Sequence, residues 1–449
     1  MGETRENSRF AFLKVLLRVN FTFPKVFFRN NFAFSKVFFY ICVWKDTDME
    51  LTDIRPIVEF YHSKLAQVTL DFKRYLYPRI NWDSRVIGIK GERGVGKTTM
   101  LLQRIKEKYS NPDDTFYISL DHYWFGTHQL QDLIEFLYKR GITEFYIDEV
   151  HKYKGWSTIL KNLVDQYKDL RIVYTGSSLL EIDNAKVDMS RRQTSYTLKG
   201  MSFREYLAYE DILHVDAISL EDLLKNHINI SMDITSKTKI LRAFEAYLRS
   251  GVYPFYKEAG SDFLIRLKAV IDTVIESDLP AVEKITYDTI EKCKKLLMII
   301  AENVPLQPNV NRLSTSLGTT RDSLLKLLYN LDKAEILELL TVELKSYKKL
   351  VNPEKIYLGN TNLMYALSPK IDVGTLRETF FIDQISAVGT VQMPSKGDFL
   401  VNGKYLFEVG GESKEFNQIA DIPDSYLAIA GIETGYSARI PLWMFGLLY

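Results

Sequence analysis

Residues 91 to 98 read Gly91-Glu92-Arg93-Gly94-Val95-Gly96-Lys97-Thr98. They match the pattern G-x-x-x-x-G-K-[ST], in which glycines let backbone N–H groups turn inward around phosphates. An apolar stretch over residues 85–90 precedes the pattern, and a stretch with one apolar face follows it over residues 98–108. We therefore expect a strand, a phosphate-binding loop and a helix whose positive dipole end faces the anion.

The residue types in this loop predict their roles. Lys97 supplies a point charge for the β- and γ-phosphates, and the hydroxyl of Thr98 is a ligand for Mg²⁺. We expect all the residues of the loop, together with Thr99 in the first helical turn, to contact a nucleotide such as ATP. The alternative is a glycine turn with a surface lysine.

A second signature lies about fifty residues downstream. Phe145-Tyr-Ile-Asp148-Glu149 reads as a buried strand that ends in two carboxylates. There Asp148 can hold Mg²⁺ through water, and Glu149 can orient and deprotonate an attacking water. A solvated acidic turn is the alternative. The Asp-Glu pair and the extra strand candidate over residues 115–120 indicate the ATPase division with an added central strand and a catalytic glutamate.

Three further candidates follow in the chain. The strand over residues 171–175 ends in hydroxyl residues, of which Thr175 and Ser177 are candidates for contacting the γ-phosphate or the water; the alternative is a helix cap. Arg192, in Ser190-Arg-Arg192, is a candidate arginine finger, with plain surface charge as the alternative. His122 and His151 follow strands but have no partner at metal-ligand spacing, so we expect no metal there.

Taken together, these motifs resemble a prokaryotic AAA-like ATPase family whose members carry a C-terminal domain of unknown function. The resemblance covers about residues 55–449. It implies ATP binding, hydrolysis and a role as a switch rather than as a metabolic enzyme. The residues that carry it are Gly91–Thr98, Phe145–His151, Thr175–Ser178, Ser202–Tyr206, Gly251–Pro254, Asp278-Leu279, Gly374–Phe381, Asp398 and Glu408.

The composition sets outer limits on function. Lys and Arg number 58 against 57 Asp and Glu, a net charge of +1, which excludes a strongly basic polyanion binder. Two cysteines, Cys42 and Cys293, allow neither a disulfide framework nor a cysteine metal site, so we expect a reducing, cytoplasmic compartment.

The first 48 residues differ from the rest. Ten of the 26 Phe residues lie there, and the pattern Phe-x-Phe-x-Lys-Val recurs from Phe10, Phe21 and Phe32. Basic residues interrupt the segment, so it cannot supply the roughly 20 apolar residues of a membrane span, and a targeting signal is weakly supported. We expect residues 1–48 to be a non-structural extension from an upstream start codon.

The remaining chain predicts an α/β P-loop NTPase with a parallel sheet and helices on both faces, followed by smaller parts. Residues 50–84 read as helical. The expected divisions are an AAA-like ATPase domain over 50–215, a helical region over 216–288, a winged helix over 289–373 and a nuclease-like α/β domain over 374–449.

The winged-helix prediction rests on a helix-turn-helix over residues 311–334 with Gly318 at the bend, followed by two strands around a lysine-rich loop. DNA binding would place Arg321 and Lys326 on phosphates. The alternative is a winged helix used for protein packing. Residues 309–358 carry only eight basic against six acidic side chains, and the second helix is rich in leucine, which favours packing.

Residues 374–449 resemble a restriction-nuclease core, with Glu378, Asp398 and Glu408 as three candidate carboxylates. The position where such cores place lysine is Gly410, and Lys414 stands at the wrong spacing. We therefore expect an inactive scaffold, closed by an apolar terminal strand from Ile440. The hypotheses left open are an ATPase switch, an ATP-gated DNA-binding protein and, less favoured, an ATPase-coupled nuclease. We also expect a protein partner, whose identity the sequence leaves open.

We expect Lys97→Ala to abolish ATP binding, because it removes the charge aimed at the β- and γ-phosphates. Equilibrium binding of labelled ATP, with and without Mg²⁺, measures the effect. Near-normal affinity in this variant would show that the loop is not the site.

Overall fold

The computed structural model describes residues 49–176, 189, 191–282, 286–342 and 352–449. The predicted extension over residues 1–48, the candidate Ser177 and the lysines of the predicted wing lie outside these residues. The description that follows starts at Leu51, from which the chain forms one unit. None of the helices among the described residues combines the length and apolar character needed to cross a membrane.

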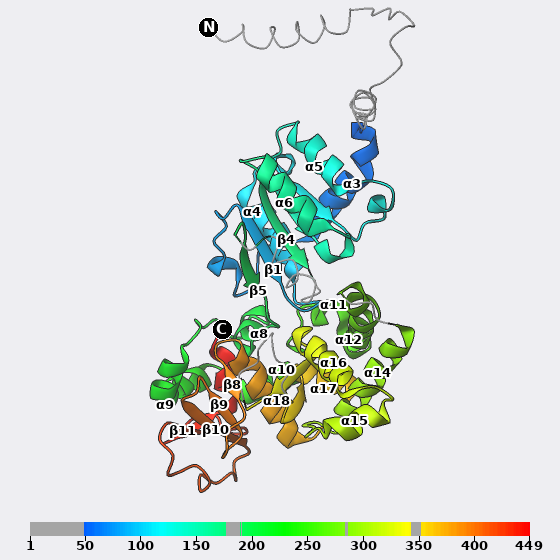
Figure 1. Cartoon of the computed structure of the whole chain (residues 1–449). Helices are drawn as coiled ribbons and strands as arrows, with labels where there is room; N and C mark the ends of the chain where they lie inside the picture. Colours follow the sequence, from blue (N-terminus) through cyan, green and yellow to red (C-terminus); the bar gives the residue numbers. More distant parts are fainter. Residues whose placement is uncertain (1–48, 177–188, 190, 283–285, 343–351) are drawn as a thin grey trace, which may run out of the picture. The chain divides into compact units, whose positions relative to one another are not determined.

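A five-stranded sheet in the order β2-β3-β4-β1-β5 carries the phosphate loop (Figure 1). All its neighbouring strands run parallel. The predicted α/β fold is confirmed, but the predicted extra strand over residues 115–120 is β2 at the edge of the sheet, and it is β4 that lies between β1 and β3. Its strands are β1 (Val86–Lys90), β2 (Phe116–Ser119), β3 (Glu144–Asp148), β4 (Arg171–Gly176) and β5 (Thr194–Thr197).

Helices pack in pairs around this sheet. The helix α3 contacts α4 and β2, and α5 contacts α6. Figure 1 shows α4 and α6 alongside β1 and β4. Buried apolar side chains of α4 and of β1 form the core between them, where Val86, Ile87 and Ile89 are fully buried. The bounds are α3 (Leu51–Gln67), α4 (Lys97–Lys108), α5 (Leu130–Tyr138) and α6 (Trp156–Gln166), with 3₁₀ turns at Tyr77–Arg79, Pro112–Asp114, Tyr123–Gly126 and Val150–Lys152.

The prediction of a helix throughout residues 50–84 is wrong in its second half. The helix α3 ends at Gln67, and the chain then runs along α4 without regular structure as far as a short 3₁₀ turn. The amide of Gln103 on α4 donates to the backbone oxygens of Thr69 (3.0 Å) and Phe72 (2.8 Å). These carbonyls find partners on another element, so the segment does not need a helix to satisfy its backbone.

Arg74 anchors this irregular segment to the rest of the core. Its guanidinium donates to both carboxylate oxygens of Glu205 (2.8 and 3.0 Å), and both side chains are buried. It also donates to the backbone oxygen of Val95 in the phosphate loop and to that of Lys199 (2.7 Å). One buried ion pair therefore joins the segment before β1, the loop after β1 and the helix α8.

A mostly helical region follows the sheet, as predicted, with a break after Ser250 at Gly251–Pro254. Its elements are α8 (Phe203–Tyr209), α9 (Leu220–Lys237), α10 (Ile240–Ser250), α11 (Tyr256–Ala259), a 3₁₀ turn (Gly260–Asp262), α12 (Phe263–Thr273), a π-helical turn (Val274–Asp278), α13 (Leu279–Val282) and α14 (Tyr287–Glu302). Ser202 caps α8 in a capping box with Glu205.

The last part of the chain returns to mixed structure. The helices α15 (Val310–Ser316) and α16 (Arg321–Lys333) precede the antiparallel pair β6 (Leu337–Leu340) and β7 (Lys355–Leu358), in the order predicted for a winged helix. Then come α17 (Thr361–Leu367), α18 (Val373–Ser386) and a five-stranded sheet in the order β12-β11-β10-β9-β8. Its strands are β8 (Val391–Gln392), β9 (Phe399–Val401), β10 (Tyr405–Gly410), β11 (Ser425–Ile429) and β12 (Arg439–Pro441). The domain boundaries themselves stay a prediction.

The prediction of a closing strand from Ile440 is only partly right. The strand β12 ends at Pro441, and residues Leu442–Leu447 form a 3₁₀ helix. Every side of this helix is buried, and Phe445 contacts the rings of Phe381 and Phe407. A strand edge would leave alternate side chains facing away from the core, whereas the helical turn buries all of them.

We expect Glu205→Gln to lower the free energy of unfolding by about 3 kcal/mol, because it leaves the buried guanidinium of Arg74 without its counter-charge. Urea unfolding followed by circular dichroism measures the change. Glu59→Gln is the control, since the Arg55–Glu59 pair is exposed on α3 and should contribute no more than about 0.5 kcal/mol. Equal effects in the two variants would contradict the anchoring role of Arg74.

Candidate phosphate-binding and hydrolytic site

The phosphate loop joins β1 to α4 at the carboxyl edge of the sheet. Gly94 and Gly96 have φ angles of 90° and 96°, in the left-handed region that favours glycine. The helix α4 begins at Lys97, so Thr98 and Thr99 lie in its first turn, where backbone N–H groups have no partner within the helix. The loop therefore has the local geometry that the sequence pattern predicts.

Lys97 is held inside the loop. Its side chain is buried, and Nζ donates to the backbone oxygens of Gly91 (2.8 Å) and Glu92 (2.5 Å). Burial lowers the pKa of Lys97, and the carboxylates of Glu149 and Asp148 oppose this shift. The ammonium group thus lies where phosphate oxygens would replace carbonyl oxygens as its acceptors.

Three hydroxyl groups converge on the carboxylate of Asp148, which is the last residue of β3 and is buried. Thr98 Oγ1 donates to Oδ2 over 2.6 Å, Tyr117 from β2 donates to Oδ2 over 2.9 Å, and Thr175 from β4 donates to Oδ1. Burial, reinforced by the neighbouring Glu149, raises the pKa of Asp148. The predicted residues Thr98, Asp148 and Thr175 therefore lie together in the structure. Tyr117, which no motif indicated, joins them.

The backbone turns sharply after Asp148. Glu149 has φ 55° and ψ 42°, a left-handed conformation that is uncommon for a residue with a side chain and that often marks functional sites. Its N–H donates to Thr175 Oγ1 over 3.4 Å. Its Oε2 lies 3.7 Å from a terminal nitrogen of Arg93 and 3.4 Å from His151 Nε2. The turn places this carboxylate beside the loop rather than in the sheet.

Arg192, the candidate arginine finger, contacts a different element. Its Nε and one terminal nitrogen donate to the two carboxylate oxygens of Asp165 on α6, over 2.6 and 3.0 Å. Both side chains are substantially exposed. A role for Arg192 at the γ-phosphate stays a prediction.

A cavity of about 500 Å³ opens beside the outer side of the loop. The loop and α4 contribute Gly94, Gly96, Thr98 and Thr99 to its wall. An apolar part of the wall consists of Val68, Phe72, Leu102, Tyr209 and Pro254. Apart from Pro254, which belongs to the motif Gly251–Pro254, these residues carry no sequence motif. Val68 and Phe72 lie in the segment that the sequence predicts to be helical, so sequence reasoning missed them.

Residues in and just after the helical break also contact the loop. The Tyr253 hydroxyl donates to Glu92 Oε2 over 2.5 Å, and Asn360 Nδ2 donates to the same hydroxyl over 2.9 Å. Loss of water around the carboxyl group raises the pKa of Glu92. A Cβ atom on Gly94 would lie 2.9 Å from the ring of Phe255, so only glycine fits there without displacing the ring. The downstream chain is therefore part of the wall of this site.

The donor atoms at the loop suit Mg²⁺. A threonine hydroxyl and a carboxylate, from Thr98 and Asp148, meet at its edge, and hard oxygen donors are those that Mg²⁺ prefers. Among the described residues, no three His, Cys, Asp or Glu side chains lie close enough together to hold a metal ion. Mg²⁺ is usually bound by one or two carboxylates together with water and substrate phosphates, so the pair fits this mode of binding.

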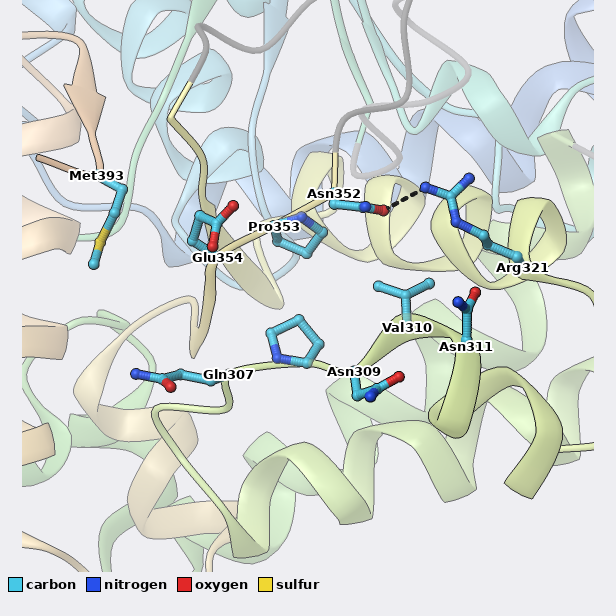
Figure 2. A pocket seen from close by; sticks show the side chains of 10 residues that line it. Gln307, Asn309, Val310, Asn311, Arg321, Asn352, Pro353, Glu354 and Met393 are labelled. Carbon is cyan, nitrogen blue, oxygen red and sulfur yellow. Dashed lines mark hydrogen bonds between the residues drawn. The ribbon is translucent and has the colours of Figure 1, made fainter. Parts of the chain in front are cut away.

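The predicted DNA-contacting residues lie elsewhere. Arg321, exposed in the first turn of α16, lines a polar cavity of about 570 Å³ and donates to Asn352 over 2.8 Å, as Figure 2 shows. Lys326 is also exposed. The leucines of α16 at positions 324, 325, 327, 328 and 331 are all buried, which agrees with burial on more than one side of this helix.

The three carboxylates of the nuclease-like part occupy neighbouring elements. Asp398 lies opposite Glu408 by the register of β9 and β10, and Glu378 stands on α18, which packs on β10. Burial raises the pKa of both Glu378 and Glu408, and the charge of Asp398 adds to both shifts. Lys414 does come near Glu408, with Nζ 3.7 Å from Oε2, because its stem fills the space beside Gly410. The unfavourable spacing noted in the sequence therefore does not prevent this contact.

Comparisons with known proteins agree with the geometry of the loop. Residues 83–207 match the family described as AAA domain. This part of the chain is an AAA-like P-loop ATPase domain, and it supports nucleotide binding. An uncharacterized protein of Methanocaldococcus jannaschii is 26% identical over 396 residues, which cover 80% of this chain and 82% of that protein.

Solved structures of two nucleotide-binding proteins are similar to part of this chain. The Walker-type ATPase of Pyrococcus abyssi is 11% identical, with a TM-score of 0.37 over 66% of this chain and 95% of that chain. AMPPCP-bound DnaA from Aquifex aeolicus is 14% identical, with a TM-score of 0.22 over 64% of this chain and 89% of that chain.

We expect the purified protein to lack metal-dependent nuclease activity. Burial raises the pKa of Glu378 and Glu408, which disfavours their charged, metal-binding forms, and Gly410 stands where such cores place a lysine. Incubation of plasmid DNA with Mg²⁺ or Mn²⁺, followed on agarose gels, measures cutting. Cutting that disappears in Asp398→Ala would overturn this expectation, and Asp421→Ala serves as the matched control.

Proposed function

We propose that this protein binds ATP with Mg²⁺ at the phosphate loop and hydrolyses it slowly, as a nucleotide-controlled switch. The convergence at Asp148 carries the proposal. Thr98 from the loop and Thr175 from β4 meet on this carboxylate, and Glu149 follows it directly. An ordinary acidic turn would not collect two hydroxyls from separate elements around one buried carboxylate.

The residues divide the chemistry between them. Lys97 binds and orients the β- and γ-phosphates, and Thr98 and Asp148 hold Mg²⁺, which when bound neutralises charge on the phosphates. Glu149, which is partly exposed beside the loop, accepts the proton of the attacking water. The Thr175 hydroxyl donates to Asp148 and accepts from the Glu149 backbone N–H. It therefore fixes the positions of these two carboxylate residues relative to each other.

The cavity beside the loop is the place for the rest of the nucleotide. Its apolar wall of Val68, Phe72, Leu102 and Tyr209 lies next to the first turn of α4. The rings of Phe72 and Tyr209 are 4.8 Å apart and form one aromatic corner. A base that enters from the loop would be buried against this wall.

Hydrogen bonds between the loop and downstream segments support the switch proposal. Glu92 accepts a hydrogen bond from Tyr253, and Asn360 donates to the same hydroxyl, so the loop is linked through Tyr253 to a second downstream segment. A γ-phosphate and Mg²⁺ order the segments around them. If ATP binds one arrangement more tightly by only about 2–3 kcal/mol, the populations shift roughly 30- to 150-fold.

An ATP-gated DNA-binding protein is the second candidate. The order of α15, α16, β6 and β7 and the exposed side chain of Arg321 support it. The buried leucines of α16 weigh against it, because they leave little of that helix for a DNA groove. Binding to duplex DNA measured against salt separates the two candidates, since phosphate contacts produce a steep dependence.

We expect Glu149→Gln to leave ATP bound while hydrolysis falls by roughly 100-fold or more, because the amide keeps the volume but cannot accept a proton. Steady-state release of phosphate and equilibrium binding of ATP are measured on the same preparation.

Glu135→Gln, on α5 and outside the site, is the control and should keep wild-type turnover. Turnover of Glu149→Gln within twofold of wild type would remove Glu149 from the catalytic role. Hydrogen exchange of this variant with ATP and with ADP then tests the switch. Identical protection of residues 251–255 in the two states would leave the switch without support.

A further inference from the structure

A buried carboxylate from the helical region lies beside the catalytic candidates. Asp278 ends the π-helical turn between α12 and α13, and its side chain is 2% exposed. Its Oδ1 lies 3.6 Å from His151 Nε2, 3.4 Å from Lys152 Nζ and 3.9 Å from a terminal nitrogen of Arg93. Single π-helical turns inside α-helices often occur at functional sites.

Two of these side chains, His151 and Arg93, also face Glu149. His151 Nε2 is 3.4 Å from Glu149 Oε2, and the same terminal nitrogen of Arg93 is 3.7 Å from that oxygen. His151 is fully buried. Asp278 and Glu149, which are 129 positions apart in the sequence, therefore share one histidine and one arginine.

The charges in this cluster are incompletely paired. Burial alone would raise the pKa of Asp278, but His151, Arg93 and Lys152 more than offset it and hold the pKa below its usual value. Asp278 is therefore an anion at neutral pH. Its Oδ2 and the Nε of Arg93 are buried without a hydrogen-bond partner among the described residues. Such groups are uncommon and costly in a part that serves only to stabilise a fold.

We propose that Asp278 is a positioning residue for hydrolysis at Glu149, an inference that rests on the proposed ATPase function. Asp278 contacts both His151 and Arg93 and holds these two side chains in place beside Glu149. Without its carboxylate, both side chains would lose a contact that fixes their position relative to Glu149.

A consequence for regulation follows from the position of Asp278 in the chain. The α12–α13 segment that carries it comes after the sheet and after the break at Gly251–Pro254. A displacement of this segment would withdraw Asp278 from His151 and Arg93. Hydrolysis would then slow without a change in the phosphate loop. Rearrangement in the downstream chain thereby acts on the catalytic carboxylate.

The test compares two carboxylates in the same helical turn. Asp278→Asn keeps the size of the side chain and removes its charge. Glu276→Gln makes the same change two residues away, at a partly exposed carboxylate that pairs with Lys294 over 2.5 Å. We expect Asp278→Asn to lower kcat about 10- to 100-fold, as loss of a supporting partner typically does, with little change in the affinity for ATP. Glu276→Gln should match the wild type.

A double-variant cycle distinguishes positioning from a general structural effect. If Asp278 acts through His151, Asp278→Asn should cost much less in the His151→Gln background than alone, so that the two effects are not additive. Additive losses, or an unchanged kcat in a folded Asp278→Asn protein, would overturn the proposal. Thermal unfolding identifies a variant that fails to fold, and Asp278→Ser then replaces it in the same cycle.

The proposed function itself is tested by the wild-type protein. If the wild type releases no phosphate from ATP, the ATPase assignment fails first. If it hydrolyses ATP and Asp278→Asn is equally active, only the role of Asp278 fails.

Discussion

A buried carboxylate that must find hydrogen-bond donors organises the centre of this molecule. Asp148 ends β3 inside the sheet, where an unpaired charge would be costly. Its donors come from β2, β4 and the first turn of α4. The hydrogen bonds to the Asp148 carboxylate thereby fix the relative positions of three strands and the phosphate loop. The next residue, Glu149, is turned out of the sheet and toward the loop.

Other buried charged side chains around Asp148 also bond to partners from distant parts of the chain. Arg74, buried beneath the loop, needs Glu205 from α8 and the carbonyl of Val95. Glu92, on the loop, accepts a hydrogen bond from Tyr253, which lies in the helical break at Gly251–Pro254. Asp278 supplies counter-charge near Glu149 from still farther along the chain. Downstream segments thus contact the phosphate loop and its surroundings at several points, so the sheet domain is not isolated from the rest of the chain.

The three carboxylates of the predicted nuclease-like part lie on neighbouring elements of the C-terminal half. Asp398 and Glu408 remain opposite each other on neighbouring strands, and the stem of Lys414 occupies the room that Gly410 leaves. Burial favours the neutral form of Glu408, and Glu378 accepts a hydrogen bond from Tyr357 over 2.6 Å. Burial disfavours the charged carboxylates that a metal ion would need as ligands.

The sequence by itself determined the α/β class, the phosphate loop and the Asp148-Glu149 strand end, because each depends on residues close together in the chain. It also predicted Thr98 and Thr175, since parallel strands end at one edge. Only the tertiary structure decided the irregular path after Gln67, the aromatic wall at Phe72, and the places of Tyr117 and Asp278. These features depend on side chains from distant segments that satisfy one another's hydrogen bonds and charges, and such pairings leave no local pattern in the chain.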